Sequence, residues 1–292
     1  MKGIITKTIG GFFFVADNEK NIYKTKIRGK IQKEVYPGDY AEFHMGDNPE
    51  VGIIEKVYSR KNLLKRPKVA NVEQVLVMQS FAEPPLNRRL LDRFLIMVQA
   101  SNLKPLIVIN KSDLRDKINE KMLNDYKKAN FNIFIISVKK EKGLDDIYTQ
   151  LKNTVTVLAG PSGVGKSSLI NKIIPEADLK VNSVSSNLKR GVHTTRHVEL
   201  LPVRKENENS KNQGWVVDTP GFTSLELDDI SPEELEFLYP EFDEYRRQCK
   251  FNMCSHIHEP KCAVKRAASE DKISKKRYEN YKEFRQELEK KE

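Results

Sequence analysis

The chain has 292 residues, of which 38% are hydrophobic and 32% are charged, and its formal net charge is +10. This length allows two or three modest domains, and the hydrophobic content is enough for buried cores. The sequence contains no apolar run of the roughly 18 residues that argue for a membrane span. Its N-terminus lacks the continuous apolar region of a signal peptide. We therefore expect a cytoplasmic protein with no membrane partner.

The positive charge is concentrated at the two ends of the chain. Residues 1–70 carry 14 Lys and Arg against 8 Asp and Glu, and residues 241–292 carry 14 against 11. The middle, residues 71–240, is nearly neutral, with 23 against 22. An ordinary solvated surface would spread the excess more evenly, so this distribution favours nucleic-acid contacts at the ends.

Short strands separated by turn signals occupy residues 3–58. The predicted strands are GIITKTI, FFFVAD, IYKTKIR, DYAEFHM and VGIIEKV. Five short strands in fewer than 70 residues predict a small β-barrel of the OB or SH3 type over residues 1–68. An OB-type barrel is a common platform for RNA, but a purely structural barrel explains the pattern equally well.

The sequence changes character after SRKNLLKRPKVANVE, which we interpret as a basic linker. From Val72 onward, strand-like runs alternate with helical stretches. The expected strands are VEQVLVM, PLIVIN, NIFIISV, TVTVLAG, HVELLPV and GWVVDTP, and the expected helices lie near residues 87–101, 114–129, 143–152 and 166–174. This alternation predicts an α/β domain over residues 69–225, with a mostly parallel sheet and helices on both faces.

Residues 226–292 form the third expected domain, and its pattern is helical. SPEELEFL opens a predicted helix, with Ser231 as the N-cap, Pro232 at the first helical position and Glu234 completing a capping box. Residues 269–290 are expected to form a charged terminal helix.

A phosphate-binding loop follows the strand TVTVLAG. Gly160-Pro-Ser-Gly-Val-Gly-Lys-Ser167 fits G-x-x-x-x-G-K-[ST] and lies between a predicted strand and a predicted helix. A simple glycine-rich turn would need neither the Lys-Ser pair nor this context, so a phosphate loop is favoured. The backbone N–H groups and the helix N-terminus attract phosphates. We expect Lys166 to reach the β- and γ-phosphates and Ser167 to hold Mg²⁺. The residues expected around the phosphates are Gly160, Pro161, Ser162, Gly163, Val164, Gly165, Lys166, Ser167 and Ser168.

A base-reading motif, Asn110-Lys-Ser-Asp113, ends the strand PLIVIN. The Asp113 carboxylate can accept hydrogen bonds from the N1–H and the exocyclic amine of guanine, whereas adenine offers the wrong pattern. The stem of Lys111 can cover the base, and Ser137, which follows NIFII, is a candidate for a second contact. Alone, the motif could start a helix with Asp113 as its N-cap. Together with the phosphate loop, it predicts a GTP site that includes Asn110.

Two further segments are typical of GTPase switches. Asp218-Thr-Pro-Gly221 ends a strand, and there Asp218 can hold Mg²⁺ through water while the Gly221 N–H meets the γ-phosphate. In LKRGVHTTRHVEL we assign Thr195 to the Mg²⁺ shell, with Thr194 as the alternative. An exposed polar loop explains this composition equally well. The expected magnesium ligands are Ser167, Thr195 and Asp218.

These motifs occur in a rotated order. The usual GTPase begins with the phosphate loop, but here the base-reading motif comes first and the chain is cut after the second switch. A site built at the carboxyl ends of strands needs its groups close in space, not in a fixed chain order. Two half-equipped GTPase domains are the alternative, but a single copy of each motif in about 150 residues favours one permuted domain.

All three cysteines lie in a short window with the spacing Cys249-x₄-Cys254-x-His256-x₅-Cys262. Three thiolates and one imidazole match a closed, tetrahedral structural Zn²⁺ site. His258 is a competing fourth ligand. Three unrelated reduced cysteines would not be confined in this way, so the cluster predicts one zinc ion that stabilises a small domain.

The permuted motifs NKSD, GPSGVGKSSL, GVHTT and DTPGF, with the cysteine spacing, resemble the RsgA or YjeQ family of circularly permuted bacterial GTPases. The resemblance covers the whole chain. It implies an OB barrel, a permuted P-loop GTPase domain and a zinc-binding C-terminal domain. It also implies binding to the 30S ribosomal subunit and its 16S rRNA late in maturation, and hydrolysis of GTP to GDP that the subunit stimulates. We expect a monomer.

One departure from Ras-type GTPases concerns catalysis. Phe222 follows Asp-Thr-Pro-Gly, near where many GTPases have a glutamine that orients water. Phenylalanine cannot do so, and His193 is the candidate within the chain, although it could equally be an ordinary loop histidine. The expected catalytic residues are Lys166, His193 and Thr195. The rival functions are an RNA-binding regulator that needs no turnover and a metabolic P-loop kinase.

Overall fold

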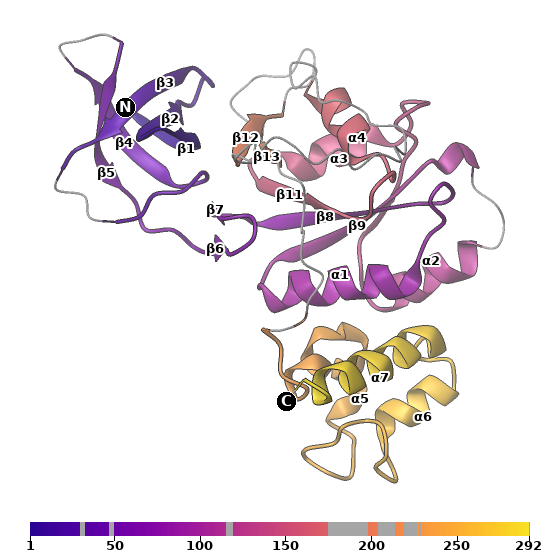
Figure 1. Cartoon of the computed structure of the whole chain (residues 1–292). Helices are drawn as coiled ribbons and strands as arrows, with labels where there is room; N and C mark the ends of the chain where they lie inside the picture. The colour runs from indigo at the N-terminus through magenta and orange to yellow at the C-terminus, as the bar shows by residue number, and fades with distance from the viewer. Residues whose placement is uncertain are drawn as a thin grey trace, which may run out of the picture.

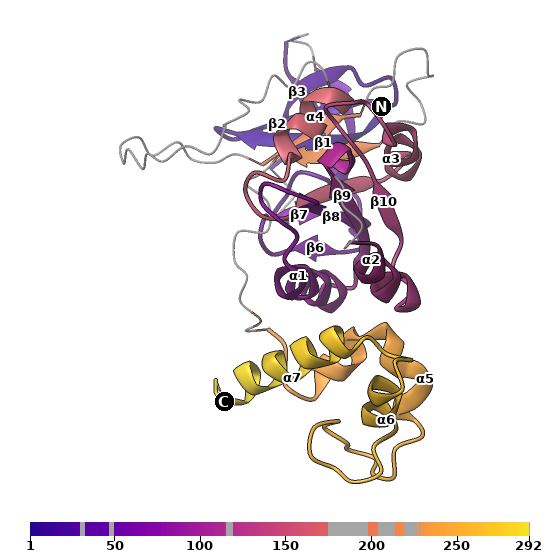
Figure 2. The ribbon, with the colours of Figure 1, turned by 90° about the vertical axis from the view of Figure 1, so that its right-hand side faces the viewer.

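A computed structural model of the chain describes residues 1–29, 33–46, 50–114, 119–174, 198–203, 214–218, 227 and 229–291. A β-barrel at the N-terminus lies beside a sheet covered by helices, and a third, helical region packs below helices α1 and α2 (Figure 1). After a quarter turn, the helical region is again seen below α1 and α2 (Figure 2). No helix in the described part of the chain is long and apolar enough to cross a bilayer.

Five strands form the closed barrel, in the order β1-β2-β3-β5-β4. They are β1 (Lys2–Ile9), β2 (Phe12–Ala16), β3 (Ile22–Ile27), β4 (Tyr40–Met45) and β5 (Gly52–Val57). Alternating side chains fill the interior, with Ile5, Val15, Ala41, Phe43 and Ile54 at its centre. The predicted five-stranded barrel is therefore confirmed. The barrel closes through a parallel pairing of β3 with β5, which no local sequence pattern predicts.

The stretch interpreted as a linker contains a small hairpin. Strands β6 (Leu63–Leu64) and β7 (Val69–Ala70) pair antiparallel, and Leu64 and Val69 are buried in the core of the following domain. The interpretation as a simple linker is wrong in this respect. The two apolar pairs were too short to stand out among the lysines and arginines that surround them.

The central sheet has six strands in the order β10-β9-β8-β11-β13-β12. All neighbours are parallel except β12, which runs antiparallel to β13. The strands are β8 (Gln74–Ser80), β9 (Lys104–Asn110), β10 (Ile133–Ile135), β11 (Val155–Ala159), β12 (Glu199–Pro202) and β13 (Trp215–Asp218). Strands β8 and β11 are buried on both faces, which explains their continuous runs of apolar residues.

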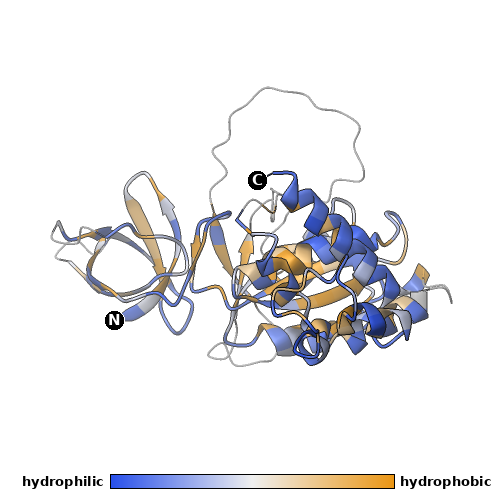
Figure 3. Ribbon diagram, turned by 90° about the horizontal axis from the view of Figure 1, so that it is seen from below, coloured by the Kyte–Doolittle hydropathy of each residue, from blue (hydrophilic) through white to orange (hydrophobic). Residues whose placement is uncertain are grey.

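Helices cover both faces of this sheet. Helices α1 (Arg88–Ala100) and α2 (Asn119–Lys128) pack on one face, and α3 (Leu144–Leu151) and α4 (Lys166–Ile173) pack on the other. Hydrophobic residues are concentrated in the central strands, whereas the helix at the C-terminus is mostly hydrophilic (Figure 3). The predicted two-faced α/β sheet is confirmed.

The C-terminal region is helical but differs in detail from the prediction. It contains 3-10 helices η4 (Glu234–Leu238) and η5 (Pro240–Phe242), followed by α5 (Asp243–Arg246), α6 (Ala263–Ser269) and α7 (Lys275–Glu289). The capping box forms, because Ser231 and Glu234 exchange hydrogen bonds, but the helix that follows is a short 3-10 helix. The terminal helix predicted over residues 269–290 is present as α7, but it begins only after Ser274, which caps it, and the short helix α6 before it was not predicted from the sequence.

A buried ion cluster fastens α7 to the α/β domain. The Arg277 guanidinium is 2% exposed and pairs with Asp92 of α1 and with Glu241 of η5. The Asn280 amide donates to the second Asp92 oxygen at 2.6 Å. Three aromatic rings, those of Tyr126, Phe131 and Tyr239, lie 5.0–5.2 Å from the guanidinium. The helical region is thus joined to α1 by a buried ion pair, and water can reach these charges only if the two elements separate.

We predict that Arg277→Met costs about 3–5 kcal/mol of stability, because it leaves the Asp92 and Glu241 carboxylates buried without their counter-ion. Urea unfolding followed by circular dichroism would measure the loss. Arg89→Met is the matched control, because Arg89 of α1 also pairs with a residue of α7, Glu283, but is 48% exposed. Its loss of stability should stay below about 1 kcal/mol. Equal losses in the two variants would contradict this account of the interface.

Candidate functional site

The candidate site lies at one edge of the central sheet. The phosphate loop follows β11 and the base-reading motif follows β9, with β8 between these two strands. Because the three strands are parallel, their carboxyl ends meet at the same edge. This is where ligands bind in open α/β sheets, even though the two motifs are about 50 residues apart in the chain.

The phosphate loop has a backbone that only glycine tolerates at two positions. Gly160 has φ 139° and Gly165 has φ 99°. A Cβ on Gly160 would collide with the Met78 carbonyl oxygen, and one on Gly165 would collide with the Asn110 side-chain nitrogen. Helix α4 begins directly after Gly165, so its free N–H groups point into the loop. The loop is therefore shaped to bind an anion.

Lys166 folds back over this loop. Its Nζ donates to the carbonyl oxygens of Gly160 and Pro161, at 2.8 and 2.7 Å. Partial burial lowers the pKa of Lys166 from its usual value. Ser167 and Ser168 follow in the first turn of α4 and are half-buried. A phosphate entering the loop would give the ammonium group a charged partner in place of two neutral carbonyls.

Asn110 joins the two loops. Its Nδ2 donates to the Val164 carbonyl oxygen at 2.9 Å, and its Oδ1 accepts from the Val138 N–H at 3.1 Å. The side chain is only 3% exposed, so both bonds lie in a low-dielectric environment where breaking them is costly. Asn110 therefore holds the phosphate loop at a fixed position relative to the loop after β10.

Asp113 and Ser137 form a second pair at this edge. The Ser137 hydroxyl donates to Asp113 Oδ1 at 2.5 Å and accepts from the Lys140 N–H at 3.1 Å. The hydrogen bond from Ser137 is the largest cause that lowers the pKa of Asp113. The carboxylate is therefore held ionised, as an acceptor for two N–H donors. Ser137, which was expected to meet the base, orients Asp113 in the structure.

The segment between β8 and α1 also contacts the two loops, which no motif in the sequence indicated. Lys111 has φ 61° and its Nζ donates to the Glu83 carbonyl oxygen. A Cβ built on Gly163 would lie 3.3 Å from Pro84. The Ser80 hydroxyl donates to the Pro84 carbonyl oxygen at 2.7 Å and fixes this turn. Backbone contacts of this kind leave no residue signature.

The switch residues are only partly within the described structure. His193, Thr194, Thr195 and Gly221 lie outside the described residues, as does Phe222. Asp218 ends β13 at the same sheet edge as the two loops, and its backbone pairs with Glu199 of β12. The fold thus places the end of β13, where the second switch is predicted to begin, beside the phosphate loop that follows the neighbouring strand β11.

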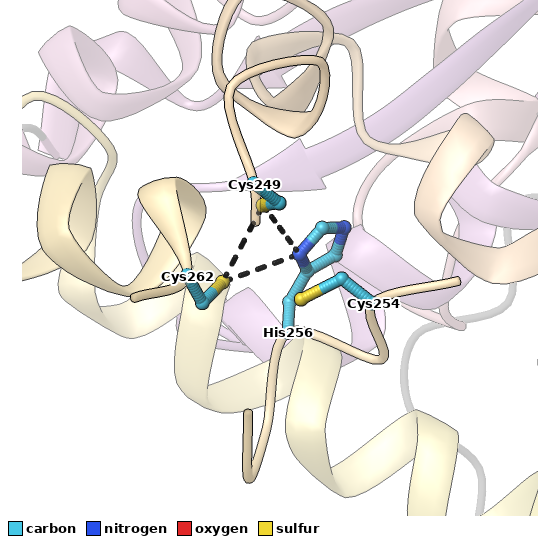
Figure 4. Close-up of side chains that lie close together, drawn as sticks. All are labelled: Cys249, Cys254, His256 and Cys262. Carbon is cyan, nitrogen blue, oxygen red and sulfur yellow. Dashed lines mark hydrogen bonds between the residues drawn. The ribbon is translucent and has the colours of Figure 1, made fainter. Parts of the chain in front are cut away.

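The predicted metal ligands converge in the C-terminal region (Figure 4). Ligand atoms of Cys249, Cys254, His256 and Cys262 all lie within 4.8 Å of one another. The Cys249 and Cys262 sulfurs are 3.8 Å apart, and His256 Nδ1 lies 3.6 and 3.3 Å from them. Tetrahedral zinc with Zn–S bonds near 2.3 Å requires sulfurs about 3.8 Å apart, so these residues fit zinc.

Glu236 completes the surroundings of this cluster. His256 Nε2 lies 2.8 Å from a Glu236 carboxylate oxygen, which directs Nδ1 towards the sulfurs. The Tyr278 and Tyr281 hydroxyls donate to the His256 and Ser255 carbonyl oxygens, at 2.6 and 2.8 Å. His258 is exposed and does not belong to the cluster, so the geometry favours His256 over it.

Comparison with known proteins gives this arrangement a family. The family profile described as RsgA GTPase matches residues 57–228, and the profile described as RsgA N-terminal domain matches residues 2–54. The chain belongs to the RsgA GTPase family. The family assignment confirms the resemblance seen in the permuted motifs.

This chain matches its relatives over nearly the full length of both proteins. Proteins named small ribosomal subunit biogenesis GTPase RsgA, from Bacillus cereus (strain ATCC 14579) and Clostridium botulinum (strain Langeland), are 42% and 43% identical to this chain. The alignments cover 98% and 96% of this chain and 97% and 95% of those proteins.

The fold agrees with two crystal structures in the same family. YloQ, described as a circularly permuted GTPase, and YjeQ from Thermotoga maritima both match with a TM-score of 0.81 and 35% identity. The matches cover 100% and 98% of this chain and 96% and 98% of those chains. The chain therefore has the circularly permuted GTPase fold with an N-terminal OB-type barrel.

We predict that Asn110→Ala weakens guanine-nucleotide binding by about ten- to a hundredfold, because two buried hydrogen bonds between the loops are lost. Titration with a fluorescent GDP analogue would measure the affinity. Asn252→Ala, in an exposed loop of the C-terminal region, is the control and should bind normally. Unchanged affinity in a folded Asn110→Ala protein would contradict the joining role.

We predict one zinc ion per purified chain, measured by plasma mass spectrometry. Cys262→Ser should lose most of it, because a hydroxyl is a much poorer zinc ligand than a thiolate. His258→Ala should retain it, since His258 lies outside the cluster. Loss of zinc in His258→Ala but not in His256→Ala would show that the ligand assignment is wrong.

Proposed function

We propose that this protein is a GTPase that acts in late maturation of the small ribosomal subunit. It binds the 30S subunit and its 16S rRNA, and the subunit stimulates hydrolysis of GTP to GDP and phosphate. The observation that carries the proposal is that Asn110 bonds to the phosphate loop and to the loop after β10, at the sheet edge where Ser137 bonds to the Asp113 carboxylate. The family and the names of the relatives support the ribosomal role.

Each group at the edge has a proposed task in binding GTP. Asp113 accepts from the guanine N1–H and amine, Ser137 keeps this carboxylate oriented, and the Lys111 stem covers the base. The N–H groups from Gly160 to Ser168 surround the phosphates, and Lys166 leaves the two loop carbonyls to bind the β- and γ-phosphates. Bound Mg²⁺ would neutralise charge between these phosphates, and Ser167, Thr195 and Asp218 would hold it.

Hydrolysis is proposed to depend on an arrangement that the free protein lacks. Lys166 stabilises the charge that develops on the phosphates. Phe222 cannot orient water, and His193 is the proposed residue within the chain for this task. The 30S subunit would place His193 and the switch loops correctly. Turnover by the isolated protein should therefore be slow.

The parts of the chain are proposed to divide the work. Residues 1–68 form the RNA-binding barrel, residues 69–225 the GTPase domain and residues 226–292 the zinc-binding domain. One structural zinc ion would stabilise a region with little core of its own. We propose a cytoplasmic monomer, in keeping with a role on ribosomal subunits, and GDP as a competitive inhibitor of GTP.

GTP turnover with and without purified 30S subunits tests the function. We expect stimulation of at least tenfold, which corresponds to about 1.4 kcal/mol in the activation barrier. Addition of 50S subunits or replacement of GTP by ATP should give no stimulated turnover. Equal rates with and without 30S would contradict the ribosome-coupled GTPase. A His193→Ala protein that binds GTP and 30S but does not turn over would favour the enzyme over a regulator that needs no turnover.

Base selectivity has its own test. Asp113→Asn should weaken GTP binding by at least about a hundredfold, because an amide cannot accept both guanine N–H groups. The variant should gain affinity for xanthosine triphosphate, whose 2-oxo group accepts a hydrogen bond from the new amide. Competition titrations would measure both effects, with Asp146→Asn on α3 as the control. Retention of GTP preference by Asp113→Asn would place the base elsewhere and reopen the P-loop kinase.

A further inference from the structure

The outer face of strands β1, β2 and β3 carries an unusual set of side chains. The strand register, together with the contact of Lys26 with the Phe12 ring, places them in two cross-strand rows, each with a phenylalanine on the middle strand. One row is Lys7, Phe14 and Lys24, and the other is Ile9, Phe12 and Lys26. We call these six residues the aromatic–lysine face.

The barrel does not need these two phenylalanines for its core. Neighbours on the same strand, Phe13 and Val15, point inward and pack with the buried residues, as does Tyr23 of β3. Because side chains alternate along a strand, Phe12 and Phe14 point outward, and both are half-exposed. Large aromatic rings on the solvent side of a small barrel indicate a contact surface.

Lysines lie over both rings. Lys24 Nζ is 4.1 Å and Lys26 Nζ 5.0 Å from the centre of the Phe12 ring, and Lys7 Nζ is 5.1 Å from that of Phe14. Lys24 and Lys26 are exposed, and among the described residues neither has a carboxylate partner within ion-pair distance. The face therefore combines positive charge with flat apolar surfaces.

We propose that the aromatic–lysine face binds an unpaired segment of RNA. Bases would stack on Phe12 and Phe14, and Lys24 and Lys26 would contact the phosphates. The two rings are two residues apart along one strand, about 6.8 Å, so successive bases of an extended strand can use both. A duplex hides its base faces and cannot stack in this way. The proposal rests on the ribosomal function proposed above and specifies where and how RNA is bound.

Lys7 connects this face to the GTPase sheet. Its Nζ forms an ion pair with Glu199 of β12 at 2.9 Å, and β12 lies beside the barrel (Figure 1). Glu199 is the register partner of Asp218, the last residue of β13 before the second switch. An RNA phosphate that draws Lys7 away would free Glu199 directly opposite Asp218. RNA on the barrel would thus act on the strand pair that leads to the switch.

The test uses the full-length protein and a fluorescent RNA decamer of mixed sequence without self-complementarity. The double variant Phe12→Ala/Phe14→Ala should bind the single strand at least about tenfold more weakly. Tyr58→Ala is the matched control. Tyr58 also lies near two lysines, Lys2 and Lys56, but its hydroxyl bonds to Glu42, so binding should change less than about twofold. The same decamer annealed to its complement should bind more weakly and should not respond to the double variant.

Glu199→Gln tests the connection. Removing the carboxylate frees Lys7 for phosphate, so the single strand should bind more tightly, by up to about fivefold. Loss of affinity in Glu199→Gln would overturn the connection through Lys7.

Four outcomes would overturn the proposed binding face. The first two are that the unaltered protein does not bind the decamer, and that the double variant binds it as well as the unaltered protein does. The other two are that the duplex, or polyglutamate, binds as tightly as the single strand, and equal binding of polyglutamate would indicate that charge alone is recognised. Turnover with 30S subunits, measured on the same proteins, separates the two levels of inference. If 30S stimulates turnover but binding of the decamer does not depend on the Phe12 and Phe14 rings, only the proposed binding face is wrong. If 30S does not stimulate the unaltered protein, the proposed function itself fails.

Discussion

The buried amide of Asn110 is the constraint on which the candidate site depends. It bonds to the phosphate loop with its nitrogen and to the loop after β10 with its oxygen, so one side chain sets the distance between two chain-distant segments. The glycine at 165 is required because the same amide occupies the space of a Cβ. A site defined by such contacts at a parallel sheet edge does not depend on where the chain begins, which explains why a permuted order is tolerated.

The permutation has a structural consequence at each end of the GTPase domain. The C-terminal region follows the predicted second switch in the chain and is also fixed to α1 through Arg277 and Asp92. The barrel meets the edge of the sheet at β12, where Lys7 pairs with Glu199, and Lys20 lies 3.8 Å from the Trp215 ring centre. The barrel therefore contacts β12 and the first residue of β13, the strand that ends at Asp218. Two flanking parts are thus in contact with elements that adjoin the nucleotide site.

Much of this architecture could be predicted because local patterns determine it. The barrel strands and the six sheet strands appear in the sequence as apolar runs between turn residues, and the phosphate loop, NKSD and the zinc ligands carry fixed spacings. What could not be predicted depends on contacts between distant residues. Glu236 beside His256, the turn at Pro84 and the β3–β5 pairing leave no local signal. The helix predicted after Ser231 is a short 3-10 helix, which the sequence could not indicate because a capping box specifies how a helix starts, not its type or length.

We propose that the bound nucleotide determines how tightly this GTPase binds the small ribosomal subunit. Co-sedimentation of the protein with 30S subunits, in the presence of a non-hydrolysable GTP analogue or of GDP, tests this claim most directly. The account predicts at least about tenfold tighter binding with the analogue, a difference of about 1.4 kcal/mol. Equal affinity in the two nucleotide states would contradict it, because a ligand that does not distinguish the two states cannot shift their populations.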